Sequence, residues 1–116
     1  MKVLVCGGRD FADAQWLSDV LTGLLHETGG ELLVIHGGAR GADSLAWAFA
    51  QDHGLPRSVF LADWGRYGKR AGPLRNQRML DEGRPDLLVA FPGGRGTADM
   101  VARALEAGVP VRRPRR

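Results

Sequence analysis

The sequence has a single cysteine and no long apolar run. Cys6 is the one cysteine among 116 residues, so an internal disulfide framework cannot form and nothing indicates an oxidising compartment. No apolar run approaches the roughly 18 residues typical of a membrane span. An apolar run follows directly after Met1 and Lys2, which leaves no room for a secretory signal. We therefore expect a cytoplasmic protein that does not insert into membranes.

Several common motifs for cofactors and metals are also missing. The pattern Gly-x-x-x-x-Gly-Lys-Ser/Thr does not occur, which disfavours a P-loop NTPase. No Gly-x-Gly-x-x-Gly follows the first apolar run, which disfavours a dinucleotide-dependent dehydrogenase. His26, His36 and His53 lack metal-ligand spacing with cysteine or carboxylate partners. We expect neither a metal site nor a cofactor.

Positive charge is concentrated at the end of the chain. The formal net charge is +3, and the segment 112–116 contains four arginines, which leaves about −1 for the rest. A basic tail on a nearly neutral body is a weaker sign of DNA binding than a basic stripe across a fold. We therefore predict one domain over residues 1–111 and a solvated basic tail over residues 112–116. Nucleic-acid binding through this tail stays open as the less favoured alternative.

Short apolar runs recur along the chain and predict strands. They cover residues 3–5, 32–35, 59–61, 87–91 and, more weakly, 109–111. Apolar runs without polar alternation are typical of parallel strands that are covered on both faces. About five parallel strands are therefore expected.

Apolar stripes at helical spacing follow three of these runs. They are Leu17, Val20, Leu21 and Leu24; Ala42, Leu45, Ala46 and Phe49; and Ala98, Val101, Ala102 and Leu105. Alternation of strands and helices with short connections predicts an α/β fold, a doubly wound parallel sheet in three layers, α/β/α.

Local signals suggest where the helices begin and end. Glycines stand where the three helices should end, at Gly29, Gly30, Gly54 and Gly108. Asp10 is predicted to cap the helix that follows Phe11. The glycine- and cation-rich segment 62–72 is predicted to be a functional loop, followed by a helix from Pro73 or Leu74 to Asp81.

Three predicted strands run into glycine clusters that contain arginine. Glycine lets backbone N–H groups approach a phosphate, the following helix adds its positive end, and arginine matches phosphate oxygens. Each cluster alone can equally be a tight strand-to-helix turn, but three at one sheet edge favour a binding pocket. The predicted ligand contacts are Gly7, Gly8, Arg9, Gly37, Gly38, Arg40, Gly41, Asp43, Arg75, Asn76, Pro92, Gly93, Gly94, Arg95, Gly96 and Thr97.

Four further residues call for individual interpretation. Asp43 either contacts ribose or moves a proton, or it is a first-turn carboxylate favoured by the helix dipole. Trp64 and Tyr67 either stack on a base or form a lid that packs on its own domain. Cys6 is predicted to be a buried structural thiol.

The segment 92–97, Pro-Gly-Gly-Arg-Gly-Thr, resembles the signature of the SLOG superfamily, which includes the LOG phosphoribohydrolases. Residues 7–11, 36–43, 72–79 and 96–100 resemble its small YspA branch, a cpYpsA-related domain. The resemblance implies a Rossmann-like fold whose glycine loop holds a nucleotide phosphate. LOG enzymes carry a glutamate three residues after the motif threonine. This chain has Met100 there, preceded by Asp99.

Two main functional hypotheses follow. The first is binding of a nucleotide or nucleotide-derived small molecule by a sensory or sequestering domain. The alternative is a LOG-type N-glycosidase acting on nucleoside 5′-monophosphates, with Asp43 or Asp99 as the catalytic acid or base. We predict that Asp99 pairs with Arg103 and that Met100 lies opposite the buried stripe of its helix.

An oligomer is also expected. Trp47 and Met100 lie off the apolar stripes of their predicted helices, so both are candidates for a subunit interface. Twofold pairing is the commonest closed arrangement, and we predict a homodimer.

Overall fold

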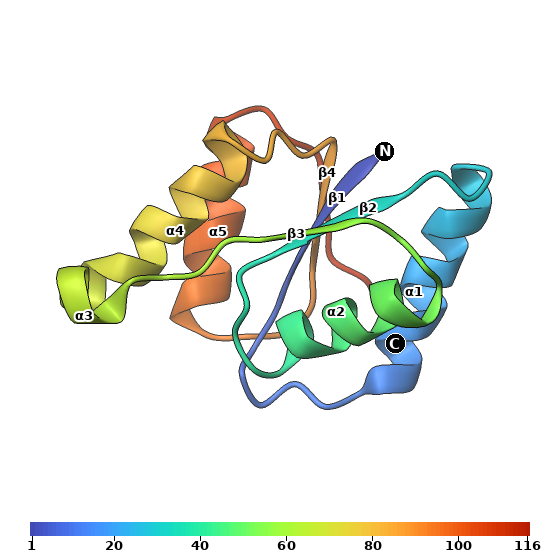
Figure 1. Ribbon diagram of the computed structural model, residues 1–116, viewed down its shortest axis with the longest axis horizontal. Helices are drawn as coiled ribbons and strands as arrows, with labels where there is room; N and C mark the ends of the chain where they lie inside the picture. The colour runs from blue at the N-terminus through green and yellow to red at the C-terminus, as the bar shows by residue number, and fades with distance from the viewer.

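The computed structural model describes all residues from 1 to 116 and contains one five-stranded sheet between two layers of helices (Figure 1). All strand pairs are parallel, in the order β3-β2-β1-β4-β5. This confirms the predicted α/β, Rossmann-like fold. The elements are β1 Lys2–Cys6, α1 Ala14–Glu27, β2 Leu33–His36, α2 Ala42–Asp52, β3 Arg57–Val59, α3 Trp64–Tyr67, the 3-10 helix η1 Gly68–Arg70, α4 Ala71–Asp81, β4 Leu87–Ala90, α5 Arg95–Glu106 and β5 Val111–Arg112.

The side chains of each strand alternate between two cores, one on each face of the sheet. Val3 and Val5 of β1 join the core beneath α1 and α2, whereas Leu4 joins the core beneath α4 and α5. Because both faces are covered, the strands are apolar without polar alternation. The predicted stripes of α1 and α2 lie in the first core, as expected.

The two central strands create the place where a ligand can enter. From β1 the chain crosses to β2, and from β4 it crosses to β5 on the other side. Connections that diverge in this way open a crevice at the carboxyl ends of the strands. The N–H of Gly8 donates to the carbonyl of Pro92 at 2.8 Å, which joins the loops that leave these two strands.

The prediction for the buried face of α5 was wrong. The structure buries Met100, Val101 and Ala104, and it leaves Leu105 62% exposed. The helix is therefore rotated by one residue, about 100°, from the predicted orientation. Val101 belongs to both stripes, so periodicity does not separate them. Met100 belongs to the same core cluster as Cys6 and Ala90, whose small side chains leave space for its thioether.

The connection after β3 is more helical than predicted. Residues 64–70 form α3 and η1, and α4 begins at Ala71 rather than at Pro73 or Leu74. The carboxylate of Asp63 accepts a hydrogen bond from the N–H of Arg66, which caps α3. Gly65 within α3 did not prevent this short helix, and Gly68, which follows it, has a positive φ of 55°.

Other boundaries differ by a few residues. Asp13, rather than Asp10, caps α1 by accepting from the N–H of Trp16. β3 covers Arg57–Val59, whereas the predicted run began at Val59. The prediction missed the start of the strand because Arg57 and Ser58, which pair with β2, are polar. The glycines predicted at helix ends all have positive φ, namely Gly29, Gly30, Gly54 and Gly108.

The C-terminal segment returns to the body of the protein. β5 extends one residue past the predicted domain end, because Arg112 pairs with Val89 of β4. Arg112 lies 3.5 Å from Glu27 and Arg116 pairs with Asp13, so both face α1. No helix combines the length and apolar character that a bilayer crossing requires. The homodimer stays a prediction. Of its two proposed contacts, Trp47 is exposed, whereas Met100 is buried in the core of its own chain and cannot lie at a subunit interface.

Candidate functional site

A cavity of about 650 Å³ opens at the carboxyl ends of β1 and β4. Its size falls within the range of small-molecule sites, roughly 300–1,000 Å³. Strand ends, two glycine loops and one wall from α3 to α4 form it. The predicted residues that line it are Gly7, Gly8, Arg9, Asp43, Arg75, Asn76, Gly94, Arg95, Gly96, Thr97 and Asp99.

Six predicted residues do not line this cavity: Gly37, Gly38, Arg40, Gly41, Pro92 and Gly93. Arg40 points into solvent and lies 3.7 Å from Asp10, itself fully exposed. The structure therefore brings together the first glycine loop (residues 7–10) and the third (residues 92–97), whereas most of the second (residues 37–41) lies outside the cavity.

The second glycine loop is closed by its own carboxylate. One oxygen of Asp43 accepts hydrogen bonds from the N–H groups of Gly37 at 3.1 Å and Ala39 at 3.2 Å. The N–H of Gly38 donates to Nδ1 of His36 at 3.0 Å. The Asp43 carboxylate therefore takes the position of the anion that such N–H groups would otherwise bind.

Arg75 of α4 clamps the same loop from the other side. Its Nη1 donates to the carbonyl of Gly37 at 2.6 Å, and its Nε donates to the side-chain oxygen of Asn76 at 3.0 Å. Burial lowers the pKa of Arg75, and Asp43 partly opposes this effect. Burial raises the pKa of Asp43, although the loop N–H groups and Arg75 favour its charged form.

Several glycines are required for packing between loops. A Cβ on Gly7 would lie 2.6 Å from the Cβ of Ala42, and a Cβ on Gly41 would overlap the carbonyl of Gly8. A Cβ on Gly93 would overlap the Thr97 hydroxyl. By contrast, a Cβ on Gly94 would meet no atom within 4 Å. Only the last of these four glycines faces open space.

The third glycine loop leaves its backbone donors free. The N–H groups of Gly94, Arg95, Gly96 and Thr97 find no acceptor within the protein. They precede or begin α5, a helix of 12 residues, so the positive end of the helix dipole adds to them. Unpaired N–H groups at a helix N-terminus form a binding site for an anion.

Three cations beside this loop are free of ion pairs. Arg9, Lys69 and Arg95 line the cavity and take part in no hydrogen bond or ion pair through their side chains. They come from the first loop, from η1 and from α5, so the positive charge converges from three elements. An anionic ligand would supply the missing counter-charge.

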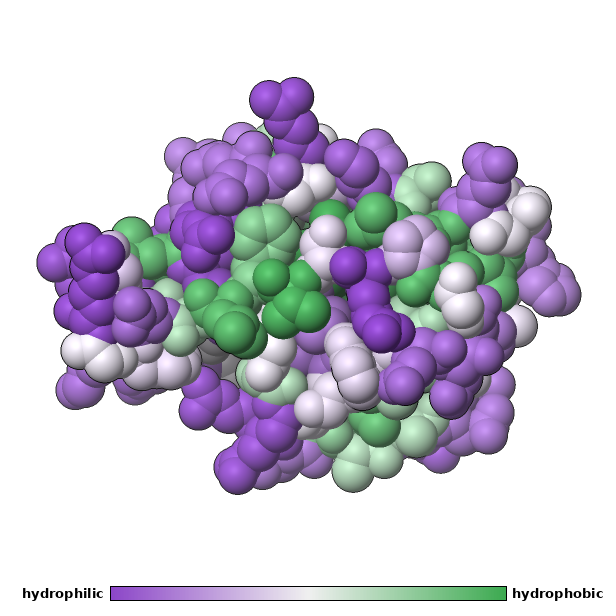
Figure 2. Space-filling model, viewed as in Figure 1, coloured by the Kyte–Doolittle hydropathy of each residue, from purple (hydrophilic) through white to green (hydrophobic).

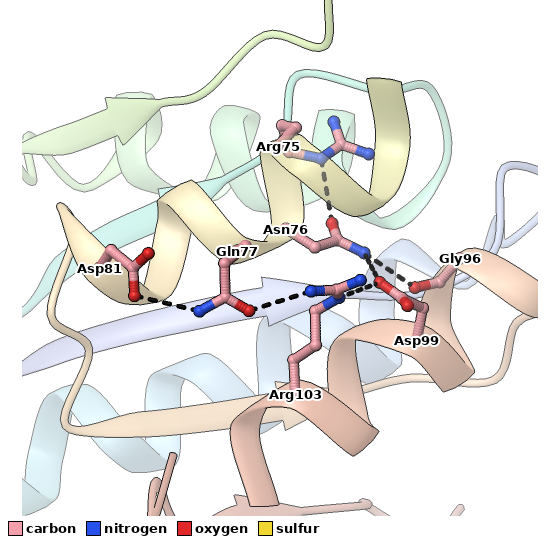
Figure 3. A network of polar contacts seen from close by, with 7 residues as sticks. All are labelled: Arg75, Asn76, Gln77, Asp81, Gly96, Asp99 and Arg103. Atoms are coloured by element: carbon pink, nitrogen blue, oxygen red, sulfur yellow. Dashed lines mark hydrogen bonds and ion pairs between the residues drawn. The ribbon is translucent and has the colours of Figure 1, made fainter. Parts of the chain in front are cut away.

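A polar network joins α4 to α5 along one wall (Figure 3). One oxygen of Asp99 accepts from Nε of Arg103 at 2.8 Å and from the side-chain amide of Asn76 at 3.0 Å. This confirms the predicted pairing of Asp99 with Arg103. The same amide donates to the carbonyl of Gly96 at 3.3 Å, which ties the third glycine loop to α4. Gln77 extends the network to Asp81.

The floor of the cavity is apolar. It is formed by Val5, Cys6, Met79 and Met100. Burial raises the pKa of the Cys6 thiol to about 12, and Asp43 contributes to the rise. The thiol is therefore neutral at physiological pH and is a poor nucleophile, in line with its predicted structural role.

Most residues of the α3–α4 wall were absent from the predicted contacts, apart from the stacking alternative for Trp64. Trp64, Lys69, Gly72, Pro73 and Met79 line the cavity. The spacing of Gly72, Asn76 and Met79 places them on one face of a helix, a signal present in the sequence. Because the segment was interpreted partly as loop, that face was not recognised.

Comparisons with known proteins agree with this architecture. The structural-genomics target TM1055 has a TM-score of 0.72 at 20% identity, covering 96% of this chain and 72% of its own. DNA processing protein A (DprA) from Streptococcus pneumoniae has a TM-score of 0.55 at 19% identity, over 96% of this chain and 58% of its own. This chain thus spans little more than half of DprA. Both show the same fold.

Sequence comparison is more specific. Gene 61 protein of Mycobacterium phage D29 is 40% identical over 117 residues, covering 95% of this chain and 93% of the phage protein. Residues 1–67, more than half the chain, match the sequence profile of a single family. This protein therefore belongs to the YspA, cpYpsA-related SLOG family.

Proposed function

We propose that this protein binds a nucleotide or nucleotide-derived molecule, with a phosphate at the third glycine loop, as a sensory or sequestering domain. One observation carries the proposal: four unpaired N–H groups and three unpaired cations surround a single cavity. A phosphate offers enough oxygens to accept from several of these donors at once. Membership of the SLOG family supports the nucleotide class.

The charge balance of the cavity favours an anion. Asp43 and Asp99 are its two carboxylates, and both already accept hydrogen bonds from the protein. Neither carboxylate lies within ion-pair distance of Arg9, Lys69 or Arg95, although Arg9 does favour the charged form of Asp43. Desolvating these cations against a neutral ligand would be unfavourable, whereas a phosphate would pair with them.

We propose binding rather than turnover. Met100 stands where LOG enzymes carry a glutamate, and its thioether cannot transfer a proton. One oxygen of Asp99 already accepts hydrogen bonds from Arg103 and Asn76, so that oxygen is not free to take a proton from water or substrate. We expect the purified protein to release no adenine from adenosine 5′-monophosphate. Base release that Asp99→Asn abolishes would instead support the N-glycosidase alternative.

Thermal denaturation with matched ligands tests the proposal. Adenosine 5′-monophosphate should raise Tm, and adenosine should raise it much less, because only the former carries the phosphate. At 100 times Kd, binding adds about 2.7 kcal/mol to the free energy of unfolding. The same comparison of nucleoside 5′-monophosphate and nucleoside, made with inosine, guanosine and cytidine, tests other bases. Equal shifts from nucleotide and nucleoside across all pairs would contradict a phosphate site.

A further inference from the structure

The wall of the cavity opposite the glycine loops carries an indole. Trp64 belongs to α3, which packs on η1 and α4 and stands at one end of the molecule (Figure 1). The side chain is 49% exposed, yet it lines the cavity. A large apolar ring that remains half exposed on a cavity wall has surface available to a ligand.

Two contacts hold the indole in this position. A Cβ on Gly72 would lie 3.2 Å from Cη2 of Trp64, so the absent side chain at Gly72 lets the ring lie against α4. On the other side, the guanidinium carbon of Arg9 lies 5.3 Å from the ring centroid. Arg9 has no carboxylate partner, so the indole is the group that holds it.

Arg9 also connects the indole to the proposed phosphate site. The preceding residue, Gly8, packs on the third loop: a Cβ there would lie 3.2 Å from the Cα of Gly93. Two consecutive residues thus bridge the distance from the third loop to Trp64. A phosphate bound at one end and a planar group at the other would both lie within reach of Arg9.

We propose that the aromatic base of the ligand stacks on Trp64 in place of the Arg9 guanidinium, which turns to the phosphate. This inference rests on the proposed function and specifies its ligand: a nucleotide with an intact base, as opposed to a sugar phosphate. A phosphate attracts a guanidinium more strongly than an exposed indole does. The vacated ring face then accepts the base, since stacking on an aromatic side chain tolerates any base.

The molecule provides a matched control for this exchange. Arg57 stacks on Trp47 with its guanidinium carbon 4.8 Å from the ring centroid. Trp47 is 41% exposed, close to the value for Trp64, but it does not line the cavity. Both tryptophans are partly exposed, and only Trp64 lines the proposed site. Figure 2 shows how hydrophilic and hydrophobic residues are distributed over one face of the molecule.

Isothermal titration with two ligands tests the inference. Adenosine 5′-monophosphate carries phosphate and base, and ribose 5-phosphate carries the phosphate alone. In the unmodified protein the nucleotide should bind more tightly by roughly five- to a hundred-fold, the range expected for stacking of one base. Trp64→Ala should remove this difference without weakening the binding of ribose 5-phosphate, whose affinity should hold or rise because Arg9 no longer has to leave the indole to reach the phosphate. Trp64→Phe should retain part of it, and Trp47→Ala should retain all of it.

The possible outcomes separate the inference from the proposed function. If neither ligand binds, and other nucleoside monophosphates also fail, the proposed function is wrong. If both bind equally to the unmodified protein, a phosphate site exists and the stacking inference is wrong. If Trp64→Ala lowers the affinity for both ligands to the same extent, the indole contacts the sugar or supports the cavity wall. That result also overturns the inference. Circular dichroism of each variant confirms that it is folded.

Discussion

The second and third glycine loops both join a buried strand to a helix, and both contain two consecutive glycines and an arginine. In the second loop the N–H groups of Gly37 and Ala39 are bound by Asp43. In the third, the N–H groups from Gly94 to Thr97 are free. A loop of this kind binds an external anion only when the protein does not supply one. Variants of the two loops test this difference, beginning with the one that should disturb the protein most.

Gly41→Ala should cause the largest loss of stability. Gly41 has a φ of 82°, and its Cβ would overlap the carbonyl of Gly8. Strained backbone and this overlap together should lower the free energy of unfolding by about 3 kcal/mol. Gly94→Ala, with open space at its Cβ, should lower it by less than about 1 kcal/mol. Urea denaturation measures both, and equal losses would contradict the contrast between the loops.

Asp43→Ala should open the second loop. The change leaves two N–H groups without an acceptor, which should lower the free energy of unfolding by about 2 kcal/mol. Asp43→Asn keeps one acceptor oxygen and should cost less. Hydrogen exchange at Gly37 and Ala39 should accelerate in the alanine variant and remain slower in the asparagine variant. Unchanged exchange would show that other groups close the loop.

The start of the second loop should make stability depend on pH. Burial, aided by Arg57, lowers the pKa of His36 to about 4, below the usual value near 6.5. The unfolded chain then binds the proton more readily, so this contribution is complete above about pH 6.5 and is lost as the pH falls towards 4. The loss should reach about 1–2 kcal/mol at pH 5.

His36→Asn tests this pH dependence, because asparagine can still accept from the N–H of Gly38. The variant should lose less stability between pH 7.5 and pH 5 than the unmodified protein does. His26→Asn, at an exposed position of α1, is the control and should follow the unmodified protein. Parallel curves for all three proteins would exclude His36 as the source.

Arg95→Ala should have the smallest effect on stability and a clear effect on binding. The Arg95 side chain is exposed and unpaired, so the free energy of unfolding should change by less than about 0.5 kcal/mol. Affinity for a nucleoside 5′-monophosphate should fall by about tenfold, as expected for a lost charge-assisted hydrogen bond. Arg40→Ala, in the second loop and outside the cavity, should leave affinity unchanged. The reverse result would place the ligand at the second loop.

The residues at the carboxyl ends of the strands were predictable members of the site, because their place in the sequence determines where they lie in the fold. Residues that follow parallel strands must meet at one edge of the sheet, so Gly8, Arg95 and Thr97 were expected near one another. Hydrogen bonds that decide which loop is free were not predictable. Arg75 reaches the second loop from α4, 38 positions away, which no local pattern encodes. Asp43 lies only four and six positions from its partners, but its position alone did not distinguish a loop-closing carboxylate from one that faces a ligand.

Local sequence was enough to specify most of the strands, the helices α1 and α2 and the glycines at helix ends, because periodicity and backbone conformation are local properties. It also carried the family signature at residues 92–97. The rotation of α5, which buries Met100, depended on tertiary packing, since two stripes with equal spacing compete for one core. The contact between Arg9 and Trp64 also depended on tertiary structure, because these two residues are 55 positions apart in the sequence.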